Sequence, residues 1–183
     1  MNREDFVKEV LYDEETLQKK AEELGKQIAR DYKGKKIIVV CILKGAVMFA
    51  TDLIKRLDLP MEIEFMVVSS YGNSTKSSGV VKIIKDLDQD IAGKDILIVE
   101  DIIDTGLTLS YLLENIFVQR KPNSVKICTL LDKPSGRKVD LPIDYVGFTV
   151  PDAFLAGYGL DYAEEYRNIP YIFIMKEEIY QNK

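Results

Sequence analysis

The sequence of 183 residues contains no histidine and no tryptophan. The missing imidazole excludes Ser-His-Asp and Cys-His nucleophiles, and it excludes most catalytic zinc sites, because these chemistries usually depend on a histidine side chain. Any acid–base step that this protein catalyses must therefore use carboxylates, lysine, tyrosine or the substrate itself. The lack of histidine thus narrows the possible mechanisms before any motif is considered.

Cysteines and long apolar runs are also scarce. Cys41 and Cys128, the two cysteines, lie within apolar segments, which is typical of reduced core residues in a cytoplasmic protein. The longest apolar run, Ile37–Leu43, has seven residues, whereas a membrane-spanning helix needs about 20. The first residues, Met1–Asp5, carry no apolar stretch of the kind found in a signal peptide. We therefore expect a cytoplasmic protein that does not bind a membrane.

Basic charge is in deficit, since 25 lysine and arginine residues face 30 aspartate and glutamate residues, for a net charge of −5. This balance disfavours broad attraction to nucleic acid, and we expect no nucleic-acid partner. It permits a phosphorylated small molecule, which needs only a few local cations and backbone amides. A chain of this length can bury roughly 70% of the surface that it exposes when unfolded, so one globular domain without disulfide bonds or structural metal is expected.

The apolar pattern alternates between helical and strand periodicity. A helix is predicted over 13–32, where apolar residues recur every three or four positions behind Asp13 as N-cap. Segment 37–43 is apolar on both sides, which favours a buried parallel strand. Further helices are predicted over 46–57 and 107–120, and further strands over 61–69, 80–85, 95–99, 124–131, 145–148 and 171–175. This alternation indicates an α/β fold, in which ligands bind at the carboxyl ends of the strands.

Three carboxylates, those of Glu100, Asp101 and Asp104, fall within five residues where a predicted strand meets a helix. The small and hydroxyl-bearing residues that follow suit a tight turn whose amides face an anion at the helix start. Helix capping by Asp104 or Thr105 is the simplest alternative, but it does not explain the adjacent charges of Glu100 and Asp101, which repel unless a cation or a polyol neutralises them. The loop lacks the Gly-Lys-Ser/Thr of a Walker A motif and the G-x-G-x-x-G of a dinucleotide site, so it indicates another kind of phosphate site.

This loop resembles the phosphoribosyl-diphosphate (PRPP) binding motif of the type I phosphoribosyltransferases, in which two acidic residues precede an Asp-Thr-Gly phosphate loop. The resemblance to the hypoxanthine-guanine phosphoribosyltransferases covers most of the chain, about residues 11–175, with its motifs in the same order. Those motifs are Leu43-Lys44-Gly45, Ser70-Tyr71, Leu131-Asp132-Lys133, Val146-Gly147-Phe148, Val150-Pro151-Asp152 and Gly157-Tyr158-Gly159-Leu160-Asp161-Tyr162.

The resemblance implies a fold and an activity. The fold would be a largely parallel twisted sheet flanked by helices, with a core over about 35–150. A small hood would be built from the N-terminal segment and about 151–183, all within a single domain over 1–183. The activity would belong to purine salvage: the 5-phosphoribosyl group of PRPP is transferred to N9 of hypoxanthine or guanine, giving IMP or GMP plus diphosphate. Mg²⁺ would be the cofactor, and a homodimer or homotetramer the assembly.

The resemblance assigns roles along the acidic loop. Glu100 and Asp101 would hold the ribose 2′- and 3′-hydroxyls, since carboxylates accept hydrogen bonds from hydroxyls. Asp104 would also serve as acid/base at purine N7 while N9 attacks, although it could instead only shape the loop. Leu107 stands where relatives carry lysine, which leaves more of the phosphate binding to amides and hydroxyls. The 5′-phosphate would be held by Asp104, Thr105, Gly106, Leu107 and Thr108.

Other segments would bind the diphosphate. Lys44 and Gly45 directly follow the strand over 37–43, and the family uses this pair to contact the diphosphate, often through a cis peptide before the lysine. Arg137 and Arg167 match further diphosphate contacts. By itself, a Lys-Gly pair after a strand is also compatible with an ordinary turn.

A loop rich in glycine, serine and threonine follows the strand over 61–69. Ser70 and Tyr71 begin it, and the segment 70–79 resembles the lid that closes over the diphosphate. Closure would exclude water from an oxocarbenium-like centre that hydrolyses readily. A mobile surface loop would show the same composition.

The purine would be recognised by residues after the last core strands. Lys133 would donate to the 6-oxygen, which discriminates against 6-aminopurines because a fixed cation accepts no hydrogen; a solvated turn lysine is the alternative. Phe154 would stack on the purine, unless it is only a core aromatic, and the backbone of Leu155 would meet the base edge. Asp161 would lie near guanine and Mg²⁺, which also contacts PRPP oxygens and water. The candidate metal ligands are Asp161, Glu100 and Asp101.

Two other classes of function remain open from the residues alone. The PRPP motif reports binding rather than turnover, so a nucleotide-sensing regulator that binds RNA could carry it, although the acidic composition disfavours this reading. A phosphotransfer protein with Asp104 as acceptor could also carry three clustered acids, but that reading leaves the C-terminal motifs unexplained.

Overall fold

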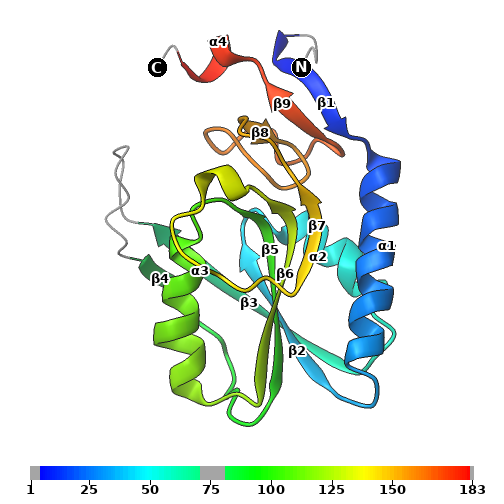
Figure 1. Ribbon diagram of the computed structural model, residues 1–183, viewed down its shortest axis with the longest axis vertical. Helices are drawn as coiled ribbons and strands as arrows, with labels where there is room; N and C mark the ends of the chain where they lie inside the picture. Colours follow the sequence, from blue (N-terminus) through cyan, green and yellow to red (C-terminus); the bar gives the residue numbers. More distant parts are fainter. Residues whose placement is uncertain (1–4, 71–80, 182–183) are drawn as a thin grey trace.

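The structure is a computed structural model that describes residues 5–70 and 81–181. Its larger sheet has six strands in the order β4-β3-β2-β5-β6-β7 (Figure 1). All neighbours in it are parallel except β3 and β4. The prediction of an α/β fold with a largely parallel sheet is confirmed. The strands are β2 (Ile37–Leu43), β3 (Met61–Ser70), β4 (Val81–Lys85), β5 (Asp95–Ile103), β6 (Ser124–Asp132) and β7 (Tyr145–Thr149).

Helices cover both faces of this sheet (Figure 1). α1 (Glu14–Asp31) and α2 (Val47–Ile54) pack on one face, and α3 (Leu107–Leu112) packs on the other. Asp13 is the N-cap of α1, as predicted, and its carboxylate accepts a hydrogen bond from the Thr16 N–H at 2.8 Å. Among the residues that the structure describes, no helix combines the length and apolar character needed to cross a bilayer.

The chain after α3 stays helical but changes its hydrogen bonding. A π-helical segment over Leu113–Phe117 and a 3₁₀ turn over Val118–Arg120 complete the stretch that the sequence predicts as one helix. This change shortens the α-helical part to six residues and leaves the start of α3, beside the acidic loop, as its regular section.

The position of the central strand β2, between helices on both faces of the sheet, explains why its sequence is apolar on both sides. Val39 and Cys41 pack with residues of α1 and α2, whereas Ile38, Val40 and Ile42 pack with residues of α3. Because side chains alternate between the faces of a sheet, each face of β2 needs its own apolar set. Burial raises the pKa of the Cys41 thiol to about 12, so that it stays protonated within the core.

A second, smaller sheet joins the two ends of the described chain. β1 (Val7–Tyr12) pairs with β9 (Ile172–Met175), and β9 pairs with β8 (Leu155–Ala156), all antiparallel. Together with the loop 157–171 and α4 (Glu177–Tyr180), this sheet forms the hood. It lies over the end of the larger sheet at which the parallel strands terminate (Figure 1). The hood that the fold prediction includes is therefore present, although neither β1 nor β8 is predicted as a strand.

Candidate active site

The acidic loop begins inside a strand rather than after it. β5 extends to Ile103, beyond the predicted end at residue 99, so that Glu100 and Asp101 are both strand residues. Adjacent strand residues point to opposite faces of a sheet. Glu100 accordingly faces a hollow beside α3, whereas Asp101 faces Gly45 on the side of α2. The two carboxylates therefore reach different sides of the sheet edge.

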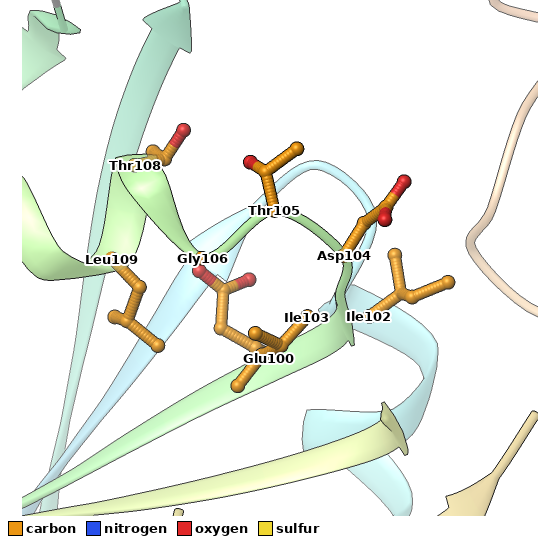
Figure 2. A pocket seen from close by; sticks show the side chains of 8 residues that line it. All are labelled: Glu100, Ile102, Ile103, Asp104, Thr105, Gly106, Thr108 and Leu109. Atoms are coloured by element: carbon orange, nitrogen blue, oxygen red, sulfur yellow. The ribbon is translucent and has the colours of Figure 1, made fainter. Parts of the chain in front are cut away.

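The hollow beside α3 opens to solvent. Figure 2 shows the side chains of Asp104, Thr105 and Thr108 on the outer side of the loop, with Leu109 directed away from them. Gly106 is the N-cap of α3 with φ 77°, and the Leu107 N–H donates to Thr105 Oγ1 at 3.4 Å. The hollow is lined by Glu100, Ile102, Ile103, Asp104, Thr105, Gly106, Thr108 and Leu109. Leu107 is thus the only residue of 104–108 outside this lining.

Both strand carboxylates are poorly solvated. Burial is the main cause that raises the pKa of Asp101 to about 6, and Asp161 adds to the rise while Arg167 opposes it. The Ile102 N–H donates to Asp101 Oδ1 at 2.7 Å. Burial also raises the pKa of Glu100 well above its ordinary value, with a contribution from the charge of Asp101. Carboxylates in such surroundings are stabilised by a ligand that donates hydrogen bonds, as a sugar diol does.

A close backbone approach holds Asp101 against the loop after β2. A Cβ atom on Gly45 would lie 1.6 Å from Asp101 Oδ2, so a larger residue there would displace this carboxylate. The peptide bond between Leu43 and Lys44 is cis. The Lys44 side chain points into solvent, where its Nζ lies 2.7 Å from Glu164 Oε2.

Asp104 and Lys133 meet at the ends of neighbouring strands. β5 and β6 pair in register up to Ile103 and Asp132, so the residues that follow each strand emerge side by side. Lys133 Nζ lies 3.9 Å from Asp104 Oδ2 and 2.8 Å from Asp152 Oδ1. Only 14% of the Lys133 side chain is exposed, which does not fit a solvated turn lysine.

Asp104 also lies directly against Gly136. A Cβ atom on Gly136 would lie 1.6 Å from Asp104 Oδ1 and 2.8 Å from Asp104 Cγ. Gly136 ends the 3₁₀ turn that follows Lys133, so this turn fixes where the Asp104 carboxylate can stand.

Arg137 braces the acidic loop by donating hydrogen bonds to its backbone carbonyls. Its Nε donates to the Asp104 carbonyl at 3.0 Å, and its Nη2 donates to the Ile103 carbonyl at 3.2 Å. The same Nη2 pairs with Asp132 Oδ1. The guanidinium thus has protein partners, and the diphosphate contact that the resemblance implies for it stays a prediction.

Arg167 joins the carboxylates of the hood loop. Its Nη2 lies 2.8 Å from Asp161 Oδ1 and 3.3 Å from Glu164 Oε1, and its Nη1 donates to the Gly159 carbonyl at 2.7 Å. Asp161 Oδ2 accepts the Glu164 N–H at 2.9 Å. Asp161 and Arg167, predicted as separate contacts, form one ion pair.

The predicted purine-contacting residues of the hood lie in its aromatic and strand regions. The Phe154 ring stacks on Tyr180, with centroids 4.8 Å apart and planes at 21°, and it meets the edge of Tyr162 at 5.6 Å. Leu155 lies in β8, opposite Ile174 of β9.

The predicted lid can be followed only to its first residue. Ser70 is the last residue of β3. Tyr71 and the rest of the predicted lid lie outside the described residues.

The candidate metal ligands do not form a closed cage. Among residues 5–70 and 81–181, no group of three or more histidine, cysteine, aspartate or glutamate side chains is placed to hold a metal ion. Both Asp161 oxygens have protein partners, at 2.8 Å and 2.9 Å. Mg²⁺ commonly keeps several waters and binds through one or two carboxylates plus substrate phosphates. A metal of that kind would need only one carboxylate from the protein, for which Asp161 and Asp101 are the candidates here.

Several residues that shape the site are absent from the sequence-based candidates. Gly136, Asp152 and Glu164 contact Asp104, Lys133 and Lys44, respectively. Asp152 belongs to the motif Val150-Pro151-Asp152, so the sequence alone could have indicated it as a site residue. The contacts of Gly136 and Glu164 join segments that are distant in the sequence, so only the fold reveals them.

Comparison with known proteins decides the family. Residues 8–163 match the family described as the phosphoribosyl transferase domain. The chain belongs to the phosphoribosyltransferase family. It groups there with the hypoxanthine-guanine phosphoribosyltransferases, since it is 58% identical to the Bacillus subtilis enzyme of that name over 96% of this chain and 97% of the relative.

Solved structures agree with this assignment. A hypoxanthine phosphoribosyltransferase from Staphylococcus aureus matches this phosphoribosyltransferase with a TM-score of 0.95 and 52% identity over the whole of both chains. A hypoxanthine-guanine phosphoribosyltransferase from Bacillus anthracis, solved with HEPES in its active site, matches with a TM-score of 0.87 and 51% identity over 92% of this chain and 98% of the other. The predicted family and the predicted transferase class are therefore confirmed.

Proposed function

We propose that this phosphoribosyltransferase moves the 5-phosphoribosyl group of PRPP to N9 of hypoxanthine or guanine, giving IMP or GMP and diphosphate, in purine salvage. The observation that carries the proposal is the meeting of Asp104 and Lys133 at the carboxyl edge of β5 and β6. Asp104 can exchange a proton with purine N7, and Lys133 can donate a hydrogen bond to a purine 6-oxygen. Family membership supports the same reaction, because the relatives bear this name.

PRPP would be held along the end of β5. The segment 104–108 offers hydroxyls and amides to the 5′-phosphate at the start of α3. Glu100 and Asp101 would accept hydrogen bonds from the ribose hydroxyls. Since these two carboxylates face different sides of the sheet edge, a ribose that reaches both would lie across that edge.

The reaction would break the bond between ribose C1 and the diphosphate oxygen, and the electron pair would leave with the diphosphate. The purine N9 would form the new bond to C1, and the N7 proton would pass to Asp104. No covalent nucleophile is needed, in keeping with a chain that has no histidine. Electrostatic stabilisation of the departing diphosphate would supply most of the acceleration.

The diphosphate would be bound by Lys44 and Arg167, together with the Gly45 backbone. Mg²⁺ would supply further positive charge at this group, with Asp161 as its protein ligand and Asp101 close by. Arg137 would act through the loop that it braces, since its guanidinium already binds the Ile103 and Asp104 carbonyls. Ser70 and Tyr71 would begin the lid over the transferring group.

The base would be read by groups of the hood and of β6. Lys133 would donate to the 6-oxygen, Phe154 would stack on the purine, and the Leu155 backbone would meet its edge. We further propose that core and hood act as one domain, that the protein works in the cytoplasm, and that it assembles as a homodimer or homotetramer.

The test is nucleotide formation by the purified protein with PRPP and Mg²⁺. Hypoxanthine, guanine and xanthine are compared by kcat/KM, with adenine as the control base that the Lys133 argument excludes. Formation of IMP or GMP with release of diphosphate is expected. No nucleotide from either hypoxanthine or guanine would refute the proposal.

A further inference from the structure

Glu164 links two cations that come from distant parts of the chain. Its Oε2 lies 2.7 Å from Lys44 Nζ, on the loop after β2, and its Oε1 lies 3.3 Å from Arg167 Nη2. Lys44 precedes Glu164 by 120 residues, so the fold and not local sequence makes this contact. One carboxylate therefore stands between the two side chains to which the proposed function assigns the diphosphate.

The backbone around Glu164 is held in an uncommon conformation. Ala163, Glu164 and Tyr166 have φ values of 53°, 68° and 74°, in the left-handed region that non-glycine residues seldom adopt. The Glu164 N–H donates to Asp161 Oδ2, which fixes the turn. Such residues persist where surrounding contacts determine their position. The carboxylate is thus presented to Lys44 and Arg167 by a turn that Asp161 stabilises.

The two ion pairs differ in how readily they can open. The Lys44 and Glu164 side chains are 63% and 64% exposed, whereas the Arg167 side chain is 21% exposed. Arg167 also keeps Asp161 as a second partner at 2.8 Å. Glu164 can therefore swing away without leaving Arg167 unpaired, and Lys44 is then free to meet another anion.

We infer that Glu164 is an internal competitor for the diphosphate subsite, whose carboxylate neutralises Lys44 and Arg167 in the free protein and is displaced when diphosphate binds. This inference rests on the proposed function. A diphosphate with several negative charges outcompetes a single carboxylate, but it binds more weakly than it would to unpaired cations. The returning carboxylate in turn favours release of the diphosphate product. Glu164 is thus a positioning residue that acts through Lys44 and Arg167.

The size of the effect follows from the exposure of the pair. Exposed ion pairs change an equilibrium by about two- to fivefold. Removal of the Glu164 charge should therefore tighten diphosphate binding by about that factor. The same change should lower the KM for PRPP while leaving kcat equal or reduced, because product release becomes slower.

The experiment measures the Kd of inorganic diphosphate with Mg²⁺ by calorimetry for the wild type, Glu164→Gln and Glu165→Gln. Glu165 is the adjacent exposed carboxylate, so its variant removes the same charge from the same loop. Glu164→Gln should bind diphosphate about two- to fivefold more tightly, with a lower KM for PRPP, and Glu165→Gln should match the wild type. Equal or weaker binding by Glu164→Gln, or an equal gain in Glu165→Gln, would overturn the inference.

A Lys44→Gln background separates competition from general repulsion. If Glu164 acts through Lys44, the gain from Glu164→Gln shrinks when the lysine is gone; a gain that persists in full contradicts the inference. The result also stands apart from the proposed function. Loss of diphosphate binding in the wild type would overturn both, whereas tight binding that is unchanged in Glu164→Gln overturns only the role of Glu164.

Discussion

Gly136→Ala is expected to impair catalysis by displacing the Asp104 carboxylate, while leaving the Asp104 side chain itself unchanged. The new Cβ atom would lie 1.6 Å from Asp104 Oδ1, whereas Cβ contacts in proteins essentially never fall below 3.0 Å. The carboxylate oxygen must therefore move by more than about 1 Å. A misplacement of about 1 Å at a catalytic group can cost about 10²-fold in rate. We expect kcat for IMP formation to fall by about that factor.

The stability of the variant should change little. The group that must move is the end of a half-buried side chain and not backbone, and alanine in place of glycine changes unfolding free energy by only about 1 kcal/mol where the backbone permits it. Thermal unfolding monitored by circular dichroism checks this point. Ser135→Ala, at the exposed neighbouring position, is the matched control and should retain wild-type kcat.

A double variant shows whether the effect passes through Asp104. If Gly136→Ala acts only by displacing this carboxylate, then adding it to Asp104→Asn causes no further loss of kcat. Wild-type kcat/KM in a folded Gly136→Ala protein would refute the reasoning, and so would full additivity of the two losses.

Three further predictions follow from the same site. Asp104→Asn should lower kcat by about 10²-fold with PRPP affinity retained, which initial rates and PRPP titration measure; unchanged turnover would remove its acid/base role. Asp101→Asn should raise the unfolding free energy by at most about 3 kcal/mol above pH 6, because the pKa of the folded Asp101 carboxyl, about 6, exceeds the ordinary 3.8. The wild type regains this stability as the pH falls from 6 towards 4, because the Asp101 carboxyl becomes protonated. Urea unfolding at several pH values in that range should therefore show the unfolding free energies of the variant and the wild type converging. A difference between them that does not change with pH would contradict the role given to the Asp101 charge. Lys133→Met should lower kcat/KM for hypoxanthine by about 10- to 100-fold and narrow the preference over adenine, and equal losses for both bases would count against recognition of the 6-oxygen.

The layered part of the fold follows directly from the sequence. The segment 37–43 is apolar on both sides because each face of β2 is covered by helices, and this burial leaves an unambiguous pattern. The hood strands leave almost none. β8 has two residues, and β1 places three exposed residues at its centre, so neither shows a clear alternation. Their strand character comes from pairing with β9, which for β1 spans most of the chain length and for β8 spans only the loop between the two strands.

The site divides in a similar way. The acidic loop is contiguous in sequence, so its carboxylates and hydroxyls can be recognised together. The end of β5 is harder to place, because Glu100 and Asp101 interrupt the apolar run while the strand continues through them. Contacts between distant segments leave no local trace, as for Gly136 against Asp104 and Glu164 against Lys44. Arg137 illustrates a third limit, since its sequence indicates a cation but not whether a ligand or the protein itself binds it.

The pairing of β1 with β9 has a consequence for how the enzyme is made. Once residue 149 has been translated, every strand of the six-stranded sheet has been synthesised. β1 still lacks its partner at that point, because β9 consists of residues 172–175. Proteins are synthesised at about 5–20 residues per second, so a nascent chain passes through an interval in which the core strands are all present and β1 is unpaired. Completion of the hood, and with it the surroundings of Arg167 and Phe154, then follows the synthesis of the core strands. Translation itself thus sets the order in which the PRPP loop and the purine-facing side of the site are assembled.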